Sequence, residues 1–255
     1  MEAGWHAAVV ARAAARGNGG SAAHRASGDY TFAVRNKPLE VQKGLFDEGP
    51  PSFDPTFAGL ERVQLDPASW VDVLPGWVRG ADNLFDALVE TRPWKQRLRL
   101  IHGKRMQEPR LTAPWSLEAG GPLEPAIIDE LRLSLSRRYG VLFDSVGFNL
   151  YRDGKDSVAW HGDHIRKEIA EPVIALVSLG APRRLLLRPK GGGPSRAWPL
   201  GRGDLFVTGG RTQRAWEHSV PKVAQAAPRI SLAFRYGLES KAYEGPEAVP
   251  QEADD

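Results

Sequence analysis

The sequence predicts an α+β fold in which helices come first and a β-rich core follows. Two segments, residues 78–89 and 123–140, carry apolar residues at helical spacing. After residue 140 come eight short segments rich in β-branched and aromatic residues, separated by Gly, Pro or Asp. Eight short strands in about 95 residues are typical of a double-sheet jelly roll or a barrel. No internal repeat is present, so we expect one domain.

Each predicted helix has an apolar stripe and a boundary signal. Asp82 or Asn83 is the expected cap of the first helix, and Pro93 ends it. Gly140 is the expected C-terminal cap of the second helix. The two stripes consist of Val78, Leu84, Phe85, Leu88 and Val89, and of Ile127, Ile128, Leu131 and Leu135.

The predicted strands alternate with turn residues. The segment PKGGGPS (189–195) has the composition of a hairpin loop between two of them. The strand segments are VGFNLYR (146–152), SVAWHGD (157–163), PVIALVSLG (172–180), RRLLLRP (183–189), RAWPLG (196–201), GDLFVTG (203–209), WEHSVPKV (216–223) and RISLAFRYG (229–237).

Composition limits the chemistry that the chain can use. The 255 residues include no cysteine, which excludes disulfide scaffolds, zinc–thiolate sites and cysteine nucleophiles. The net charge of +3 is compatible with a nucleic-acid partner but does not argue for one. No apolar run approaches the ~20 residues that span a bilayer. We expect a soluble, cytoplasmic monomer without a membrane partner.

The ends of the chain differ in composition from its centre. Residues 1–28 are rich in Ala, Gly and Arg, and we interpret them as a disordered arm in preference to a transit peptide. Residues 239–255 are acidic and contain proline, which is typical of a disordered tail. Residues 29–238 would form the single domain, with its β core at about 141–238.

A pair of residues in one predicted strand is a candidate metal site. His161 and Asp163 are two positions apart, so in a strand they point to the same face and can reach one ion. His218 lies in another predicted strand. Two imidazoles and one carboxylate with open positions are the ligand set of non-haem Fe(II) oxygenases. A lone histidine in a strand is more often structural, so this spacing alone is weak evidence.

The last predicted strand places two arginines on one face. Arg229 and Arg235 share that face with Ser231, whereas Ile230, Leu232 and Phe234 form an apolar opposite face. Buried arginines need acceptors because an unpaired buried charge is costly. They could pair with protein carboxylates, or they could hold a dicarboxylate ligand. 2-Oxoglutarate would satisfy both the arginine face and the open metal positions.

Several motifs in order resemble the AlkB family of Fe(II)/2-oxoglutarate-dependent dioxygenases, the oxidative nucleic-acid demethylases. They are EPRLTAPW, FNLYRDGKDSVAWHGD, GDLFVTGGRTQRAWEHSVPK and PRISLAFR, and the resemblance covers residues 94–238. It implies a double-stranded β-helix (jelly-roll) core with N-terminal helices packed on one sheet. It also implies Fe(II) and 2-oxoglutarate as cofactors and molecular oxygen as co-substrate.

The same resemblance implies a role for individual residues. His161, Asp163 and His218 would ligate iron and form the catalytic centre. The residues expected to contact 2-oxoglutarate are Asn149, Tyr151, Arg229, Ser231 and Arg235, with Arg229 on the distal carboxylate.

Substrate residues are less well defined. Many family members carry acidic residues directly after the His-x-Asp motif, whereas this chain has His164, Ile165 and Arg166, which puts the identity of the substrate in doubt. Glu168 or Glu171 could substitute. In the segment GKRMQEPRLTAPW, Trp115 and Met106 are candidates for one wall around a flipped base, with His161 as the other wall and core packing as the alternative for Trp115. Arg110 and Lys104 are candidate phosphate contacts.

The function implied by the resemblance is oxidative demethylation of N-alkylated bases in DNA or RNA. The products would be formaldehyde, succinate and CO2, and the partner would be a single-stranded or flipped alkylated base. Two alternatives stay open: the same oxygenase chemistry on a modified RNA, a protein or a small molecule, and a nucleic-acid-binding module without catalysis.

Overall fold

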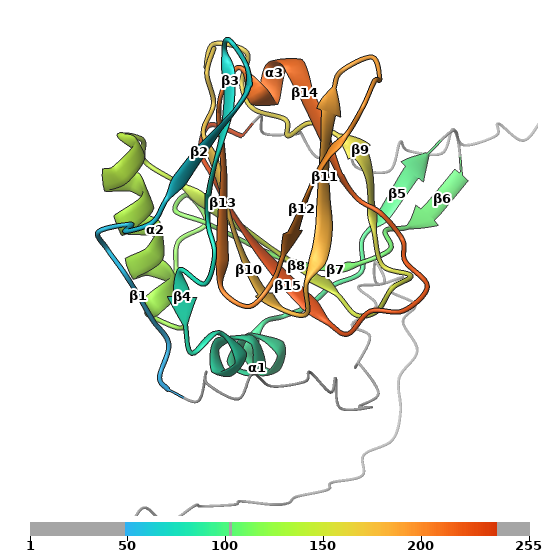
Figure 1. The fold of residues 1–255 in the computed structure, drawn as a ribbon. Helices are drawn as coiled ribbons and strands as arrows, with labels where there is room; N and C mark the ends of the chain where they lie inside the picture. Colours follow the sequence, from blue (N-terminus) through green and yellow to red (C-terminus); the bar gives the residue numbers. More distant parts are fainter. Residues whose placement is uncertain (1–48, 102–103, 239–255) are drawn as a thin grey trace, which may run out of the picture. The chain divides into compact units, whose positions relative to one another are not determined.

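The protein is described by a computed structural model, which covers residues 49–101 and 104–238. The predicted arm at residues 1–28 and the predicted tail at residues 239–255 lie outside these residues. Two β-sheets face each other in the described part, and helices cover one of them (Figure 1). The description below concerns this part of the chain alone.

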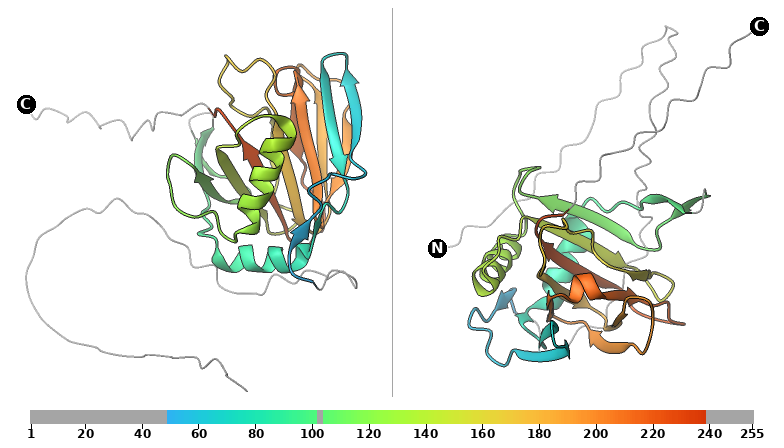
Figure 2. Two further views of the ribbon diagram at one scale, coloured as in Figure 1. Left: turned by 90° about the vertical axis from the view of Figure 1, so that its left-hand side faces the viewer. Right: turned by 90° about the horizontal axis from the view of Figure 1, so that it is seen from above.

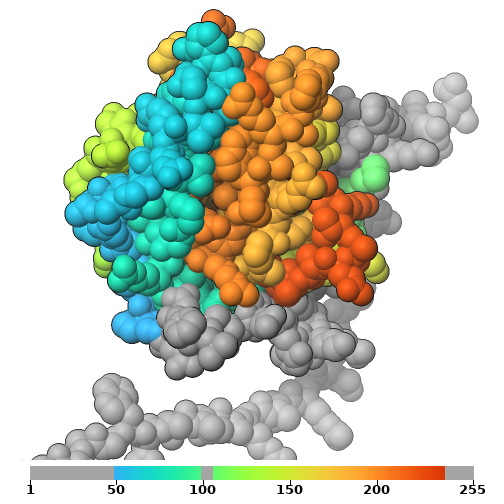
Figure 3. All heavy atoms as spheres, in the orientation of Figure 1, coloured from blue at the N-terminus to red at the C-terminus, as the bar shows by residue number. Residues whose placement is uncertain are grey.

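The larger sheet has seven antiparallel strands. In the space-filling view, the cyan residues that include β2 and β3 lie against orange residues that include β13, although more than a hundred positions separate them (Figure 3). In spatial order the strands are β2 (Glu61–Asp66), β3 (Ser69–Leu74), β13 (Asp204–Gly210), β10 (Ile174–Gly180), β15 (Arg229–Arg235), β8 (Ser145–Tyr151) and β7 (Leu111–Ser116).

The smaller sheet has four antiparallel strands. In spatial order they are β12 (Arg196–Leu200), β11 (Arg183–Pro189), β14 (Trp216–Val220) and β9 (Val158–His161). The eight strands from β8 to β15 divide equally between the sheets, and the chain crosses repeatedly from one sheet to the other. This is the arrangement of a jelly roll, so the predicted fold class is confirmed.

All eight strands expected after residue 140 are present, with β11 and β12 joined as the expected hairpin. The sequence interpretation missed the three strands that extend the larger sheet, which are β2, β3 and β7. Strand β2 reads ERVQLD and has one buried residue, so its apolar pattern is weak. Pairing with β3 places β2 in the sheet, and such a partner cannot be read from local composition.

The remaining elements are short apart from two helices. Two small two-stranded antiparallel sheets lie outside the main sheets. One consists of β1 and β4, and the other of β5 and β6. The elements are β1 (Ser52–Phe53), β4 (Val78–Arg79), α1 (Ala81–Thr91), β5 (Leu98–Ile101), β6 (Lys104–Gln107), α2 (Ile127–Tyr139) and α3 (Thr212–Ala215).

The start of α1 differs from the prediction. Its N-cap is Gly80, with φ of 62°, so Asp82 and Asn83 lie inside the first turn and are not caps. Val78 belongs to β4 and not to the helix. A side chain at position 80 would put its Cβ 2.6 Å from the carbonyl oxygen of Gly49, which only glycine avoids. The predicted cap of α2 at Gly140 is confirmed, with φ of 67°.

Both long helices pack on the larger sheet, on the side away from the smaller sheet (Figures 1 and 2). Leu88 of α1 and Leu131 of α2 are fully buried there, together with Leu232 and Phe234 of β15. A second apolar cluster lies between the two sheets and includes Leu187. The helices therefore support the outer face of β15 and leave its inner face to the space between the sheets.

Gly80→Ala should lower the free energy of unfolding by more than Gly76→Ala. Both glycines have positive φ, so alanine pays a similar conformational cost of about 1–2 kcal/mol at either position. A Cβ at Gly76 meets nothing within 4 Å, whereas a Cβ at Gly80 meets the backbone of Gly49 and Pro50. Urea unfolding of the two variants measures the difference. Equal losses of stability would contradict the close approach at Gly80.

Candidate active site

Three potential metal ligands meet at one edge of the space between the sheets. His161 ends β9, Asp163 follows two residues later, and His218 lies in β14. The antiparallel pairing of β9 with β14 sets His161 opposite His218, with 4.2 Å between ring centroids. One ligand atom from each of the three residues lies within 4.8 Å of the others. The structure thus brings together the cluster that the sequence predicted.

The two histidines are prepared to donate nitrogen lone pairs. The Nδ1 atom of His161 lies 2.8 Å from the carbonyl oxygen of Ala159, so Nδ1 carries the proton and Nε2 is free. Burial lowers the pKa of His161. Burial and the neighbouring His161 lower the pKa of His218 to about 4. Both rings are therefore neutral at pH 7, which is the form that binds a metal.

Asp163 is oriented by Arg235. The Nε and Nη2 atoms of Arg235 both lie 2.9 Å from Oδ1 of Asp163. The other carboxylate oxygen, Oδ2, lies 4.0 Å from Nε2 of His218. Burial alone would raise the pKa of Asp163, but Arg235 and the two histidines outweigh it and the pKa is lowered. The carboxylate is thus charged, with one oxygen anchored and one directed toward the histidines.

Arg229 has a different environment from Arg235. Its side chain is 1% exposed, and Nη2 donates to Oγ of Ser178 at 2.7 Å. The Nε and Nη1 atoms are buried without a hydrogen-bond partner in the described part of the chain. A guanidinium keeps its charge even where burial lowers its pKa. The hydroxyls of Ser178 and Tyr151 lie beside it and neither is an anion, so a ligand carboxylate would improve the pairing of this cation.

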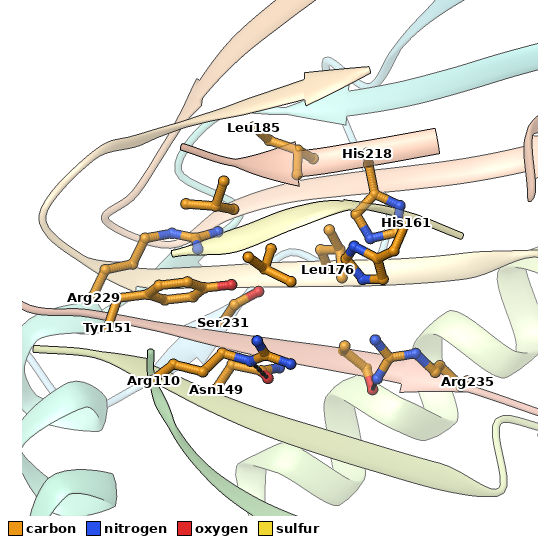
Figure 4. Close-up of a pocket in the computed structure, with 13 residues that line it drawn as sticks. Arg110, Asn149, Tyr151, His161, Leu176, Leu185, His218, Arg229, Ser231 and Arg235 are labelled. Atoms are coloured by element: carbon orange, nitrogen blue, oxygen red, sulfur yellow. Dashed lines mark hydrogen bonds between the residues drawn. The ribbon is translucent and has the colours of Figure 1, made fainter. Parts of the chain in front are cut away.

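The sequence left two roles open for these arginines, pairing with a protein carboxylate or binding a dicarboxylate ligand, and each arginine fits a different one. Arg235 pairs with a protein carboxylate, whereas Arg229 presents unpaired donors to a cavity between the sheets. Figure 4 shows Arg229 and Tyr151 at one end of this cavity and His161 and His218 at the other. A ligand with an anionic group at one end and metal-binding oxygens at the other fits this polarity.

Strand register explains why the polar residues converge. β8 pairs with β15 so that Tyr151 faces Arg229 and Asn149 faces Ser231. All five residues expected at the co-substrate line the same cavity, and the apolar residues of β15 lie in the core as predicted. The five are Asn149, Tyr151, Arg229, Ser231 and Arg235.

The residues expected to contact the substrate lie in different environments. Nε of Arg110 donates to Oδ1 of Asn149 at 3.1 Å, and Arg110 lines the cavity, so it does not lie on an open surface suited to a phosphate (Figure 4). The indole of Trp115 donates to Gly121 and the residue packs against the core cluster, and Trp115 also lines a second cavity over β7 and β8, so both core packing and a place in the substrate wall have support. Met106 is 52% exposed on β6 and does not line the cavity.

Two residues around the site were not anticipated, one beside the metal cluster and one beside Tyr151. Gln213 is buried in α3, and its Oε1 accepts from the backbone N–H of Asp163 at 3.3 Å. Arg183 is buried near the Tyr151 ring and donates to the carbonyl oxygens of Asp153, Asp156 and Pro221. Their partners are distant in sequence, so neither role was visible from local pattern. The place of Gln213 in the motif GGRTQRAWEH was the available signal.

Comparison with known proteins agrees with this geometry. Residues 128–235 match the family described as the 2OG-Fe(II) oxygenase superfamily. The chain is 33% identical over 201 residues to the alpha-ketoglutarate-dependent dioxygenase alkB homolog 3 of Homo sapiens and to that of Bos taurus. Each match covers 69% of this chain and 70% of the relative.

The chain belongs to the AlkB family. It is also 31% identical to the DNA oxidative demethylase ALKBH2 of Arabidopsis thaliana, over 61% of this chain and 62% of the relative. Among solved structures, "The structure of OsALKBH1" matches with a TM-score of 0.52 and 13% identity, covering 69% of this chain and 99% of that one. That likeness supports the jelly-roll fold.

AlkB-family membership makes the chain an oxidoreductase that uses Fe(II) and 2-oxoglutarate. The residues present fit both groups, because the cluster offers two neutral imidazoles and a carboxylate, and the buried guanidinium of Arg229 has unpaired donors. Within residues 49–101 and 104–238, no helix has the length and apolar character that crossing a membrane requires.

The metal-free AlkB-family protein should gain stability as the pH rises from about 4 to 6.5. The pKa of His218 is about 4 in the fold and 6.5 ordinarily, so in this window the unfolded chain binds a proton that the folded chain excludes. The free energy of unfolding should therefore rise by up to about 3 kcal/mol and level off above the window. Denaturant unfolding at a series of pH values measures it.

The control is a pair of histidine substitutions. His218→Gln should reduce the slope of stability against pH, whereas His164→Gln, at an exposed position, should retain it. A slope that survives His218→Gln unchanged would show that other groups cause the pH dependence.

Proposed function

We propose that this chain oxidatively demethylates N-alkylated bases in DNA or RNA, using Fe(II) held by His161, Asp163 and His218. The printed names of its relatives, an alpha-ketoglutarate-dependent dioxygenase and a DNA oxidative demethylase, support the reaction class. The observation that carries the proposal is Arg229. Its buried guanidinium, with two nitrogens lacking a hydrogen-bond partner among the described residues, lines a cavity whose other end is the His–Asp–His cluster, as a 2-oxoglutarate site requires.

When bound, Fe(II) and 2-oxoglutarate supply the oxidation of a C–H bond by molecular oxygen, with release of succinate and CO2. Hydroxylation of an N-methyl group leaves an unstable product that releases formaldehyde and the unmethylated base. The oxidising power belongs to the cofactors. The protein has to hold the ligands, orient the co-substrate and place the methyl group.

The side chains divide these tasks. Arg229 would bind the distal carboxylate of 2-oxoglutarate through its two unpaired donors, with the Tyr151 ring against it. Arg235 fixes Asp163, so that one carboxylate oxygen keeps its direction toward the cluster. Asn149 and Ser231 would supply polar contacts along the cavity wall. Most of these groups are already held by other residues, which lowers the cost of ordering them on binding.

We also propose the finer organisation of the protein. Residues 29–238 would form the catalytic domain, with residues 1–28 as an arm and residues 239–255 as a tail. The enzyme would act as a monomer in the cytoplasm. Size-exclusion chromatography with light scattering tests the monomer, and fractionation of cells tests the location.

Fe(II) and 2-oxoglutarate added without oxygen should give a weak visible absorption band, and His161→Ala should abolish it. Removal of one imidazole leaves too few ligands to hold the metal and co-substrate together. His164→Ala is the matched control, because His164 is the next histidine in sequence, is exposed and lies outside the cluster. If His161→Ala kept the band and His164→Ala lost it, the ligand assignment would be wrong.

Methylated oligonucleotides should release formaldehyde in an amount equal to the succinate formed, and unmethylated ones should not. His161→Ala should lower this rate by at least about 100-fold, because the metal is required for the chemistry. Mass spectrometry of the oligonucleotide, with a formaldehyde assay, measures both products. Succinate formation that depends instead on a protein or a small molecule would support the alternative substrates. Oligonucleotide binding without any turnover would support a non-catalytic module.

Arg229→Met should weaken 2-oxoglutarate binding by about 100-fold without lowering thermal stability. The substitution removes the charge-assisted contact to the distal carboxylate, whereas the ligand-free protein loses only an incompletely paired buried cation. Calorimetric titration of 2-oxoglutarate and the melting temperature provide the two readings. Unchanged affinity would place the distal carboxylate elsewhere.

A further inference from the structure

A second cavity adjoins the first and provides a place for the substrate base. It has a volume of about 230 Å³ and lies over β7 and β8. Arg110, Asn149 and Arg235 line both cavities, so the two are neighbours. Arg235 in turn binds Asp163 of the metal cluster. A base held in the second cavity would therefore lie beside the oxidising centre.

The second cavity is rich in hydrogen-bond donors. Arg97 lines it from an exposed position. Arg110 uses Nε on Asn149 and Nη2 on Glu108, at 3.1 and 3.3 Å, which leaves Nη1 for a ligand. Thr112 is 7% exposed, and its hydroxyl oxygen is buried without a hydrogen-bond partner. The two arginines can only donate, and the Thr112 hydroxyl can donate as well as accept, so a ligand that offers acceptors fits these three groups.

The acceptors near the cavity are already engaged. Oδ1 of Asn149 accepts from Arg110, and Glu108 forms an ion pair with Arg110. Oδ1 of Asp163 accepts from Arg235. Among the residues that the structure describes, no carboxylate lines either cavity. Arg110 and Arg235 are thus paired with carboxylates, and the exposed Arg97 supplies the remaining positive charge of the wall.

The loop after the metal motif adds no carboxylate to the described lining of either cavity. Ile165 follows directly after His164 and is 2% exposed, and it forms a backbone bridge with Leu238. Glu168 and Glu171 are exposed and line neither cavity. The carboxylates that the sequence offered as substitutes for the missing acidic residues are thus absent from the described cavity walls.

Methylated bases differ in the features that this wall would distinguish. 3-Methylthymine is neutral, and its N-methyl group lies between two carbonyl oxygens, which are acceptors. 3-Methylcytosine carries a positive charge at neutral pH, and an exocyclic amino group replaces one of the carbonyls. An amino group facing engaged acceptors leaves donors unpaired, and the cation is repelled by the guanidinium group of Arg97.

We propose that this enzyme prefers neutral N-methylated bases whose methyl group is flanked by carbonyl oxygen, with 3-methylthymine or 3-methyluracil ahead of 3-methylcytosine. 1-Methylguanine is neutral and has one carbonyl oxygen beside its methyl group, so it would precede the cationic 1-methyladenine, although each has an exocyclic amino group beside the methyl. This inference rests on the proposed function, because it names the substrate class of the same site. Arg97, Arg110 and Thr112 are the residues that would determine the preference.

The first test is binding. Two labelled single-stranded DNA oligomers of one sequence carry either one 3-methylthymine or one 3-methylcytosine, and an unmethylated thymine oligomer gives the baseline. Fluorescence anisotropy is measured on the full chain with Mn(II) and 2-oxoglutarate. The 3-methylthymine oligomer should bind about tenfold more tightly than the 3-methylcytosine oligomer. Equal affinity, or tighter binding of 3-methylcytosine, would overturn the inference.

The second test is turnover of the same oligomers with Fe(II), measured as kcat/KM. Arg97→Gln should reduce the preference for 3-methylthymine severalfold, because it removes one donor and one positive charge from the cavity. Arg79→Gln is the matched control, since Arg79 is an exposed arginine of β4 that lines neither cavity. An equal effect of both substitutions would show that net charge, and not this wall, sets the preference.

The outcomes separate the inference from the proposed function. Turnover of 3-methylcytosine ahead of 3-methylthymine would leave the demethylase function intact and overturn the preference. Absence of turnover with every methylated oligomer would overturn the proposed function. In that case the binding comparison still decides whether the cavity favours the neutral base.

Discussion

The pairing of β8 with β15 is the constraint on which the site depends. Its register places Asn149 opposite Ser231 and Tyr151 opposite Arg229, so the polar residues of both strands share one face. The other face of β15 carries Leu232 and Phe234 into the core beneath the helices. Because side chains alternate along a strand, a shift by one residue would move the arginines into the apolar core. The burial of the apolar face therefore fixes the position of the polar one.

The two ends of the cavity also differ in charge. At one end Arg235 neutralises Asp163, and this pair sits beside two neutral histidines. At the other end Arg229 has no such partner for two of its nitrogens. Burying an incompletely paired cation costs stability, and a ligand carboxylate would recover that cost on binding. The incompletely paired guanidinium of Arg229 thus lowers the stability of the ligand-free protein and favours an anionic ligand.

Much of this could be read from the sequence because the signals were local. The alternation in RISLAFR predicted both faces of β15, and the His-x-Asp spacing predicted a shared face for His161 and Asp163. The cap at Gly140 was equally local. In contrast, the partner of each arginine depends on strands far apart in the chain. Nothing in local pattern distinguishes Arg235, which has Asp163 beside it, from Arg229, which does not.

Other features could not be predicted from local sequence for the same reason. The sequence left Trp115 assigned either to a substrate wall or to the core, and the structure places it both against the core cluster and in the lining of the second cavity. Strand β2 has little apolar pattern and pairs with β3, which in turn pairs with β13, a strand that comes more than a hundred residues later. The second cavity is also a product of tertiary structure, since it needs β7 beside β8 and the end of β15.

The most direct measurement is a crystal structure of the protein with Fe(II) and 2-oxoglutarate, prepared without oxygen. The account predicts the metal between His161, Asp163 and His218, and the distal carboxylate of 2-oxoglutarate on Nε and Nη1 of Arg229. A co-substrate whose distal carboxylate lies against Arg110 or Arg97, with Arg229 left unpaired, would contradict it.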